Sequence, residues 1–456
     1  MDFKKLVYEE KENIVRDLIE IVRIKSVLTK FDPKNEGAPF GENIKIALDW
    51  FLDKAKSEGF NTENTDGYAG HIEFGDGKKF IGTIGHLDVV PEGRGWIHEP
   101  YGGEIDGEKI YGRGTLDDKG PTLAMYYAMK ILKNTNLKLN HRIKLILGTD
   151  EETAWRGIEY YFKKNPEQPV YGIIPDADFP LIYAEKGISR INIEFSSENT
   201  GILSLNGGDR DNMVPDYAEV SLEYKEKYEK HFKEYLQLNK YTGEVKKIND
   251  KIFLSINGKS AHGSTPHEGI NAIDLMLQFL IKHVPSDFTD TYKKYFLNDL
   301  TGKKLGIEFK SDEMGKTSSN VGVIKKIKSK IQLKLNYRYP KGVEFDRIIE
   351  KIKSNLKNAL VSVDHHKREL YQDPKSEFIK ILMDTYQKNT QDYNSKPFTI
   401  GGGTFARSMK NSVAYGAHFK GSESNIHQPE EFIYIKDLLK ATTIYAEALY
   451  RLANYE

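Results

Sequence analysis

The sequence contains no cysteine, and this absence excludes several kinds of chemistry. A chain without cysteine has no disulfide framework, no thiolate nucleophile and no metal held by cysteine. It is compatible with a reducing compartment, so we expect the protein to be cytoplasmic.

The sequence also lacks an excess of charge of one sign and lacks long apolar runs. Lys plus Arg and Asp plus Glu each number 67, so the formal net charge is zero and no basic field is available to hold phosphates. No window approaches the roughly 18 consecutive apolar residues of a membrane-spanning helix. Residues 1–20 instead mix both charges through an apolar stripe, which predicts an amphipathic helix. We expect neither nucleic acid nor a membrane as a partner.

The length of 456 residues predicts two or three structural units. Residues 1–185 are predicted to form the first segment of a catalytic domain, and residues 186–378 an inserted α+β lid of two ferredoxin-like units. Residues 379–456 are predicted to complete the catalytic domain, mainly because His427 has a use only beside the acids of the first segment. A monomer with an enlarged lid is expected, not from length but from the family resemblance carried by the motifs given below.

Three apolar runs of strand type lie at residues 80–85, 143–148 and 170–174, with helical patterns at 119–134 and 155–164 between them. This alternation is typical of an α/β fold. Because the runs are continuously apolar, the strands should be buried on both faces. The sequence therefore predicts a mainly parallel sheet with helices on both faces, and ligands at the carboxyl ends of its strands.

Acidic residues follow each of these runs, and a histidine also follows the first. His86 and Asp88 come after the first run, Glu151 and Glu152 after the second, and Asp176 after the third. Taken one at a time, each feature has an ordinary structural explanation. The acids could cap the N-termini of helices, and the histidine could simply be hydrogen-bonded to a neighbouring carboxylate.

Asp117 lies in a glycine-flanked turn that would join the same edge of the sheet. So many carboxylates at one sheet edge are unfavourable without cations. Carboxylate and imidazole ligands suit zinc, manganese or cobalt, while magnesium and calcium fit histidine less well. Two divalent ions sharing one carboxylate would neutralise the cluster.

Five motifs in a fixed order, GHLDVVP, GRGTLDDKGP, GTDEET, PDADFP and SNIHQPEEF, resemble those of the aminoacylase/carnosinase metallopeptidase family. The resemblance runs from the first helix to the last, and the most similar branch is the bacterial dipeptidase V type. It implies two zinc or manganese ions, with cobalt as an alternative. It further implies that Asp117 bridges the ions, that His86 and Asp176 hold one, and that Glu152 and His427 hold the other.

The resemblance also implies roles in catalysis. Glu151 matches the general base that takes a proton from a metal-bridging water, and Asp88 would orient His86. His262, in GKSAHGSTP, matches the histidine that stabilises the oxyanion. The family usually has an unusual peptide bond after the bridging acid, here between Asp117 and Asp118.

A further group of residues resembles the positions that hold the C-terminal carboxylate of the substrate. Arginine can pair bidentately with a carboxylate, and glycine lets backbone N–H groups approach an anion. A structural turn is the alternative for the GGGT segment. The residues of this group are Asn212, Arg338, Gly402, Gly403 and Thr404.

The sequence thus predicts a metallopeptidase that cleaves dipeptides. One alternative is an N-acyl amino acid deacylase of the same family, which would share the metal motifs. Another, of a different class, is a metal-binding protein without turnover; the presence of Glu151 together with every inferred ligand speaks against it.

Overall fold

The computed structural model describes residues 1–455, which separate into two compact units. The first unit contains Met1–Ala184, Gln372–Phe398 and the residues from Thr404 onward. The second contains Glu185–Tyr371 and, by a short return of the chain, Thr399–Gly403. The sequence did not indicate this return. The assignment of the units as catalytic domain and lid stays a prediction.

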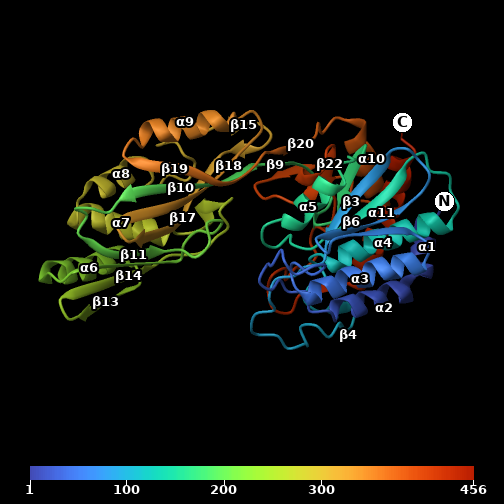
Figure 1. Cartoon of the computed structure of the whole chain (residues 1–456), viewed down its shortest axis with the longest axis horizontal. Helices are drawn as coiled ribbons and strands as arrows, with labels where there is room; N and C mark the ends of the chain where they lie inside the picture. The colour runs from blue at the N-terminus through green and yellow to red at the C-terminus, as the bar shows by residue number, and fades with distance from the viewer. Residues whose placement is uncertain (456) are drawn as a thin grey trace. The chain divides into compact units, whose positions relative to one another are not determined.

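The first unit has the predicted α/β fold, and it is built on a nine-stranded sheet (Figure 1). Its strand order is β1-β2-β6-β3-β7-β22-β9-β20, with β21 paired to β9. The parallel part is the central run β6-β3-β7-β22. The pairs β1–β2, β2–β6 and β22–β9 are antiparallel. The strands are β1 (Asn61–Thr65), β2 (Ala69–Phe74), β3 (Phe80–His86), β6 (Arg142–Gly148), β7 (Tyr171–Ile174), β9 (Ile182–Glu185), β20 (Leu370–Tyr371), β21 (Phe398–Ile400) and β22 (Ser412–Ala414). Of these, β20 and all of β21 after Phe398 are residues of the second unit.

Helices cover both faces of this sheet. Helices α3, α4 and α11 lie on one face, and α5 with the 3₁₀ helix η2 lies on the other. The predicted helix at residues 119–134 is confirmed as α4. The single helix expected in residues 1–20 is instead two helices, α1 and α2, which are separated at Glu10. The helices are α1 (Phe3–Glu9), α2 (Lys11–Val22), α3 (Glu42–Ser57), α4 (Lys119–Asn134), α5 (Arg156–Lys164), α10 (Glu377–Thr390), η2 (Phe405–Ser408) and α11 (Ile435–Ala453).

Close packing of α4 on β3 positions the start of the helix. Every residue of β3 is buried, and a Cβ atom at Gly85 would come within 1.9 Å of the Thr122 hydroxyl oxygen of α4. Only glycine lets the two backbones approach so closely. Asp117 and Asp118, which precede α4, are thereby held beside the carboxyl end of β3.

Two small sheets complete the first unit. One has the order β24-β5-β4 and the other pairs β23 with β8. Their strands are β4 (Glu104–Asp106), β5 (Lys109–Tyr111), β8 (Ala177–Asp178), β23 (Ala417–His418) and β24 (Phe432–Tyr434). Because β24 pairs with β5, the loop that carries His427 is tied to the segment that leads into Asp117.

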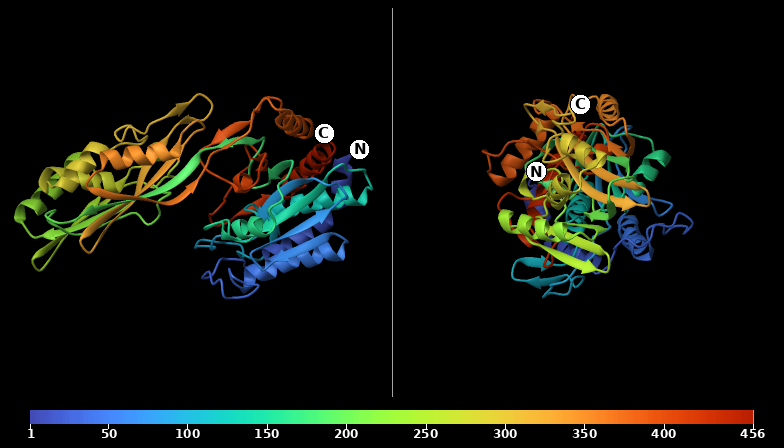
Figure 2. Two further views of the ribbon diagram at one scale, coloured as in Figure 1. Left: turned by 45° about the horizontal axis from the view of Figure 1, so that its top comes forward. Right: turned by 90° about the vertical axis from the view of Figure 1, so that its left-hand side faces the viewer.

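The second unit is built on one continuous eight-stranded sheet, in which all neighbouring strands pair antiparallel (Figure 2). Its order is β13-β14-β12-β11-β17-β18-β10-β19, and its helices pack with it around a single apolar core. The prediction of two ferredoxin-like units stays a prediction. The elements are β10 (Gly187–Ser196), β11 (Ile202–Gly207), β12 (Tyr217–Glu223), α6 (Glu226–Asn239), β13 (Gly243–Ile248), β14 (Lys251–Asn257), η1 (Pro266–Glu268), α7 (Ala272–His283), α8 (Asp287–Tyr295), β15 (Lys310–Ser311), β16 (Gly315–Lys316), β17 (Ser318–Ile327), β18 (Lys330–Tyr339), α9 (Phe345–Asn355) and β19 (Ala359–Lys367).

Within residues 1–455, no helix has the length and apolar character needed to cross a membrane.

Candidate metal centre

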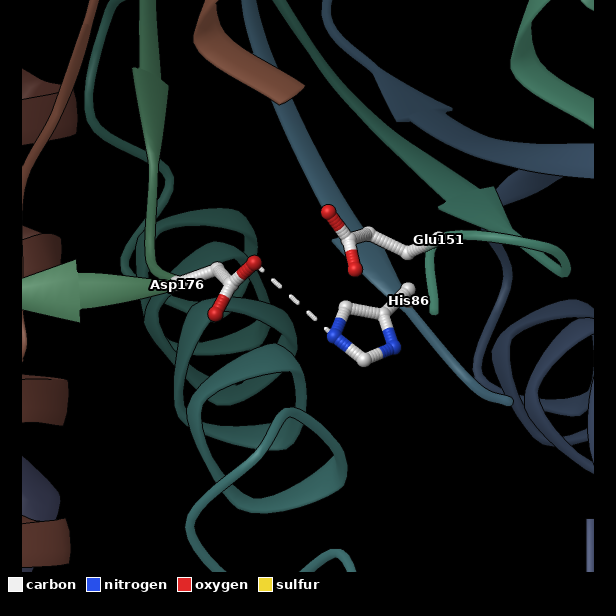
Figure 3. A group of neighbouring side chains, drawn as sticks. All are labelled: His86, Glu151 and Asp176. Atoms are coloured by element: carbon white, nitrogen blue, oxygen red, sulfur yellow. Dashed lines mark ion pairs between the residues drawn. The ribbon is translucent and has the colours of Figure 1, made fainter. Parts of the chain in front are cut away.

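The carboxyl ends of three neighbouring parallel strands carry the acids and the histidine singled out in the sequence. Strand β3 lies between β6 and β7 and ends at His86. Glu151 and Glu152 follow the end of β6, and Asp176 follows the end of β7. Figure 3 shows Glu151 and Asp176 pointing toward the imidazole of His86. Parallel pairing therefore gathers these groups at one edge of the sheet.

Asp117 lies between the two imidazoles, with one carboxylate oxygen toward each. Its Oδ1 is 3.0 Å from His86 Nε2, and its Oδ2 is 2.8 Å from His427 Nε2. His427 Nε2 is also 2.9 Å from Glu152 Oε1, and His86 Nε2 is 3.8 Å from Asp176 Oδ2. A carboxylate placed in this way has the geometry to bridge two cations.

The donor atoms form two overlapping groups, each within a span of 4.8 Å. One contains His86, Glu151 and Asp176, and the other contains His86, Asp117 and Glu152. Each group offers one imidazole nitrogen and two carboxylate oxygens. This donor set suits zinc, manganese or cobalt.

Burial and mutual repulsion make the carboxylates hard to ionise together. Burial, and then the charge of Asp117, raises the pKa of Asp176 to about 7. Burial is likewise the main cause that raises the pKa of Glu151 well above its ordinary value and also raises that of Glu152. Such a cluster binds protons where no cation is present.

The imidazoles show the complementary effect. Hydrogen bonds with Asp117 and Glu152 raise the pKa of His427 to about 10. Although burial opposes it, hydrogen bonding with His427 and His86 holds the pKa of Asp117 below its ordinary value. Among residues 1–455, no lysine or arginine forms an ion pair with the carboxylate of Asp117, Glu151, Glu152 or Asp176. The cluster thus has the shape, donors and excess negative charge that two divalent cations would satisfy.

Asp88 contacts both His86 and the turn after β6. The Asp88 carbonyl oxygen is 2.9 Å from His86 Nδ1, and its carboxylate oxygen is farther from that nitrogen, at 3.6 Å. Both oxygens of the buried carboxylate accept backbone N–H groups at 3.1 Å, one from Glu151 and one from Glu152. The carboxylate therefore fixes the turn that presents the two glutamates.

Asp118, for which the sequence suggested no definite role, supports His86 from the other side. Its Oδ2 accepts the backbone N–H of His86 at 3.0 Å and the Thr122 hydroxyl at 2.9 Å. The peptide bond between Asp117 and Asp118 is cis.

Five of the predicted substrate or oxyanion residues belong to the second unit: Asn212, His262, Arg338, Gly402 and Gly403. Strand β18 carries Arg338, whose Nη1 donates to the Gly401 carbonyl at 2.7 Å. Its Nη2 is 3.4 Å from His262 Nε2, and the Asn212 carbonyl accepts the N–H of Gly263 at 2.7 Å. The structure thus gathers this set within one unit.

His262 and Thr404 have distinct local surroundings. Burial, and then the charge of Arg338, lowers the pKa of His262 to about 4, so its ring is neutral near pH 7. Thr404 lies in the first unit, where its hydroxyl caps η2 by accepting the N–H of Ala406 at 3.1 Å.

Sequence reasoning missed two buried residues beside the cluster, Arg113 and Glu431. Both belong to motifs that were recognised, GRGTLDDKGP and SNIHQPEEF. A signal was available, because an arginine and a glutamate next to inferred ligands are candidates for a buried pair. Their ion pair measures 2.5 Å.

Comparison with known proteins identifies the class. Residues 82–451 match the model of peptidase family M20/M25/M40. The chain belongs to this family, and it is a metallopeptidase. The predicted family resemblance is confirmed, while the dipeptidase V branch stays a prediction.

Relatives of similar length match over the whole chain. The protein named "Putative dipeptidase YtjP" of Bacillus subtilis is 38% identical over 473 residues, covering 100% of both chains. A "Putative dipeptidase" of Staphylococcus epidermidis is 37% identical over 468 residues, covering 99% of each. Among solved structures, human carnosine dipeptidase 1 matches with a TM-score of 0.59 and 16% identity, covering 99% of this chain and 98% of that one. That likeness concerns the fold.

Proposed function

We propose that the protein is a dipeptidase that hydrolyses its substrate's amide bond with two divalent metal ions. The observation that carries the proposal is the position of Asp117, with one oxygen toward His86 and the other toward His427. The names of its full-length relatives support dipeptides as the substrate class.

The ligands divide into two sets in this proposal. His86 and Asp176 would hold one ion, Glu152 and His427 would hold the other, and Asp117 would contribute a carboxylate oxygen to each. When bound, the pair of ions would lower the pKa of a water held between them and polarise the substrate carbonyl. Zinc and manganese both suit the donors, and cobalt is an alternative.

Glu151 acts as the general base. It stands beside His86 and Asp176, and its backbone N–H is fixed by the Asp88 carboxylate at 3.1 Å. In hydrolysis it accepts a proton from the attacking water and passes it to the leaving nitrogen. The buried surroundings that favour its protonated form suit a group that must hold a proton between these two transfers.

His262 donates a hydrogen bond to the oxyanion. The Ser264 hydroxyl lies 2.6 Å from His262 Nδ1, and a hydroxyl that donates there leaves the ring proton on Nε2. In this tautomer Nε2 gives up its 3.4 Å contact with the Arg338 guanidinium, which is itself only a donor, and donates to the oxyanion instead. The low pKa of His262 keeps the ring neutral, so Nε2–H serves as a donor without carrying charge of its own.

Arg338, Asn212, Gly402, Gly403 and Thr404 hold the substrate's terminal carboxylate. If this anchor and the metal centre act on the same molecule, the distance between them selects for short peptides. The proposal includes a monomer with the second unit as a lid, located in the cytoplasm as the lack of cysteine suggests.

The experiment compares three substrates that share one scissile bond: a dipeptide, the N-acetyl amino acid and a tetrapeptide. Metal-free protein is assayed alone and after addition of Mn²⁺, Zn²⁺ or Co²⁺. We expect metal-restored cleavage of the dipeptide, with kcat/KM at least about tenfold above the other two. Faster cleavage of the N-acetyl compound would make the protein a deacylase. Binding of the ions without hydrolysis of any of the three substrates would favour the alternative of a metal-binding protein that has no catalytic activity.

A further inference from the structure

Glu431 lies four residues after His427, in the loop that leads into β24. Its side chain is fully buried, with 0% exposure, and it does not reach the group of candidate ligands. A glutamate at such a position must be fully paired to be tolerated. Its partners show what it holds.

All of those partners lie in the segment that leads to Asp117. Glu431 Oε1 accepts three backbone N–H groups, from Gly114 at 3.0 Å, Leu116 at 3.0 Å and Asp117 at 3.2 Å. Oε2 accepts the Arg113 guanidinium at 2.5 Å, and the Glu431 carbonyl accepts the N–H of Gly112 at 2.9 Å. One residue of the His427 loop therefore fixes the whole turn from Gly112 to Asp117.

This arrangement joins two ligands through their backbones. The His427 side chain reaches Asp117 Oδ2 at 2.8 Å, and Glu431 holds the Asp117 N–H from the same loop. Two contacts thus fix the relative position of His427 and Asp117. One joins the two side chains, and the other joins the Asp117 backbone N–H to the Glu431 carboxylate. Partners outside the ligand set commonly tune metal affinity by about 10–100-fold.

We propose that Glu431 is a positioning residue for one of the two metal sites. Oε1 sets the distance between Asp117 and His427, so it tunes the affinity of the ion held by Asp117, Glu152 and His427. The site of His86 and Asp176 shares Asp117 with the first, but it also depends on a contact that Glu431 does not make, since Asp118 holds the His86 backbone. This inference rests on the proposed two-metal function.

Glu430 supplies a matched control in the same loop. Its carboxylate also accepts two backbone N–H groups, from Ile97 at 2.7 Å and His98 at 3.1 Å, and it pairs with His98 Nδ1 at 2.7 Å. These partners lie away from Asp117. Removing this carboxylate loosens the loop as a whole but leaves the Asp117 turn in place.

The experiment titrates metal-free protein with Mn²⁺, counting bound ions by calorimetry and by the electron paramagnetic resonance of free Mn²⁺. Wild-type protein should bind two ions. E431L, which keeps the volume and removes the acceptor, should retain one ion and lose at least about tenfold in affinity for the other. E430L should bind both ions within about threefold of wild type.

The double variant R113M/E431Q separates hydrogen bonding from charge. The glutamine oxygen still accepts the three N–H groups, and methionine removes the guanidinium that would otherwise face an amide. We expect it to bind two Mn²⁺ ions within about threefold of wild type. If E431L fails to fold, this variant can still overturn the inference by losing the second ion.

Three results would overturn the inference: two tightly bound ions in E431L, an equal loss in E430L, or loss of the second ion in R113M/E431Q. Failure of wild-type protein to bind two Mn²⁺ ions would instead refute the proposed function. The two failures are therefore distinguishable.

Discussion

Replacing Asp88 by asparagine should destabilise the first unit strongly, because each oxygen of its buried carboxylate accepts one partly buried backbone N–H at 3.1 Å. Asparagine keeps one acceptor and turns an NH₂ group toward the other N–H. The retained bond loses its charge assistance, at a cost of about 1 kcal/mol. The second bond is lost and its partly buried donor is left without an acceptor, at a cost of up to about 3 kcal/mol. We expect a total of up to roughly 4 kcal/mol.

Tryptophan fluorescence during urea unfolding measures this change in the relevant unit. The chain has three tryptophans, and all of them, Trp50, Trp96 and Trp155, lie in the first unit. Excess Mn²⁺ is present so that the neighbouring carboxylates are neutralised in both proteins. D32N is the control, because exposed Asp32 accepts the N–H of Lys34 at 3.0 Å and asparagine can replace it there. A loss below about 1 kcal/mol in D88N would refute the reasoning.

Two further predictions concern the second unit. Burial raises the pKa of Asp274 to about 6, above its unfolded value, so its stabilising contribution is present below about pH 4 and is lost as the pH rises through 6. Protection of α7 from hydrogen exchange should fall by roughly 3 kcal/mol over that window in wild type and stay flat in D274N; equal slopes would contradict this. Asn336 Oδ1 accepts Arg338 Nε at 2.9 Å. N336L should therefore raise KM for a dipeptide about tenfold with kcat nearly unchanged, and an unchanged KM in steady-state kinetics would speak against carboxylate binding by Arg338.

The parts of the fold that follow from local pattern could be predicted from the sequence. The apolar run at residues 80–85 became β3, and the amphipathic stretch at 119–134 became α4 with the same ends. Because parallel strands share one carboxyl edge, the motif acids after β3, β6 and β7 had to meet. The gathering of His86, Asp117, Glu152 and Asp176 was therefore predictable in outline.

Features that depend on distant pairing were beyond local pattern. Nothing near Thr399 indicates that this segment clusters with the second unit, since the contacts that place it come from residues far along the chain. The pairing of Glu431 with the turn before Asp117 spans more than 300 residues of sequence. Burial decides that pairing, and burial is a property of the assembled structure.

The role of Asp88 shows the same limit on a smaller scale. Its spacing from His86 predicts a contact with the imidazole, and the carbonyl oxygen lies nearer to that ring than the carboxylate does. The carboxylate instead fixes Glu151 and Glu152, which the sequence places more than 60 residues away. The spacing in the sequence predicts that Asp88 lies beside His86, while the structure shows which atoms of Asp88 make each contact.

The most direct test of the central claim compares wild type with E151Q in metal-restored hydrolysis of a dipeptide, with Mn²⁺ binding measured in parallel. Glutamine keeps the size of Glu151 and removes its ability to carry the proton. If Glu151 is the general base, E151Q should still bind two Mn²⁺ ions while kcat falls by about 10²–10⁴-fold. Activity within about tenfold of wild type, with both ions bound, would contradict the role of Glu151 as general base.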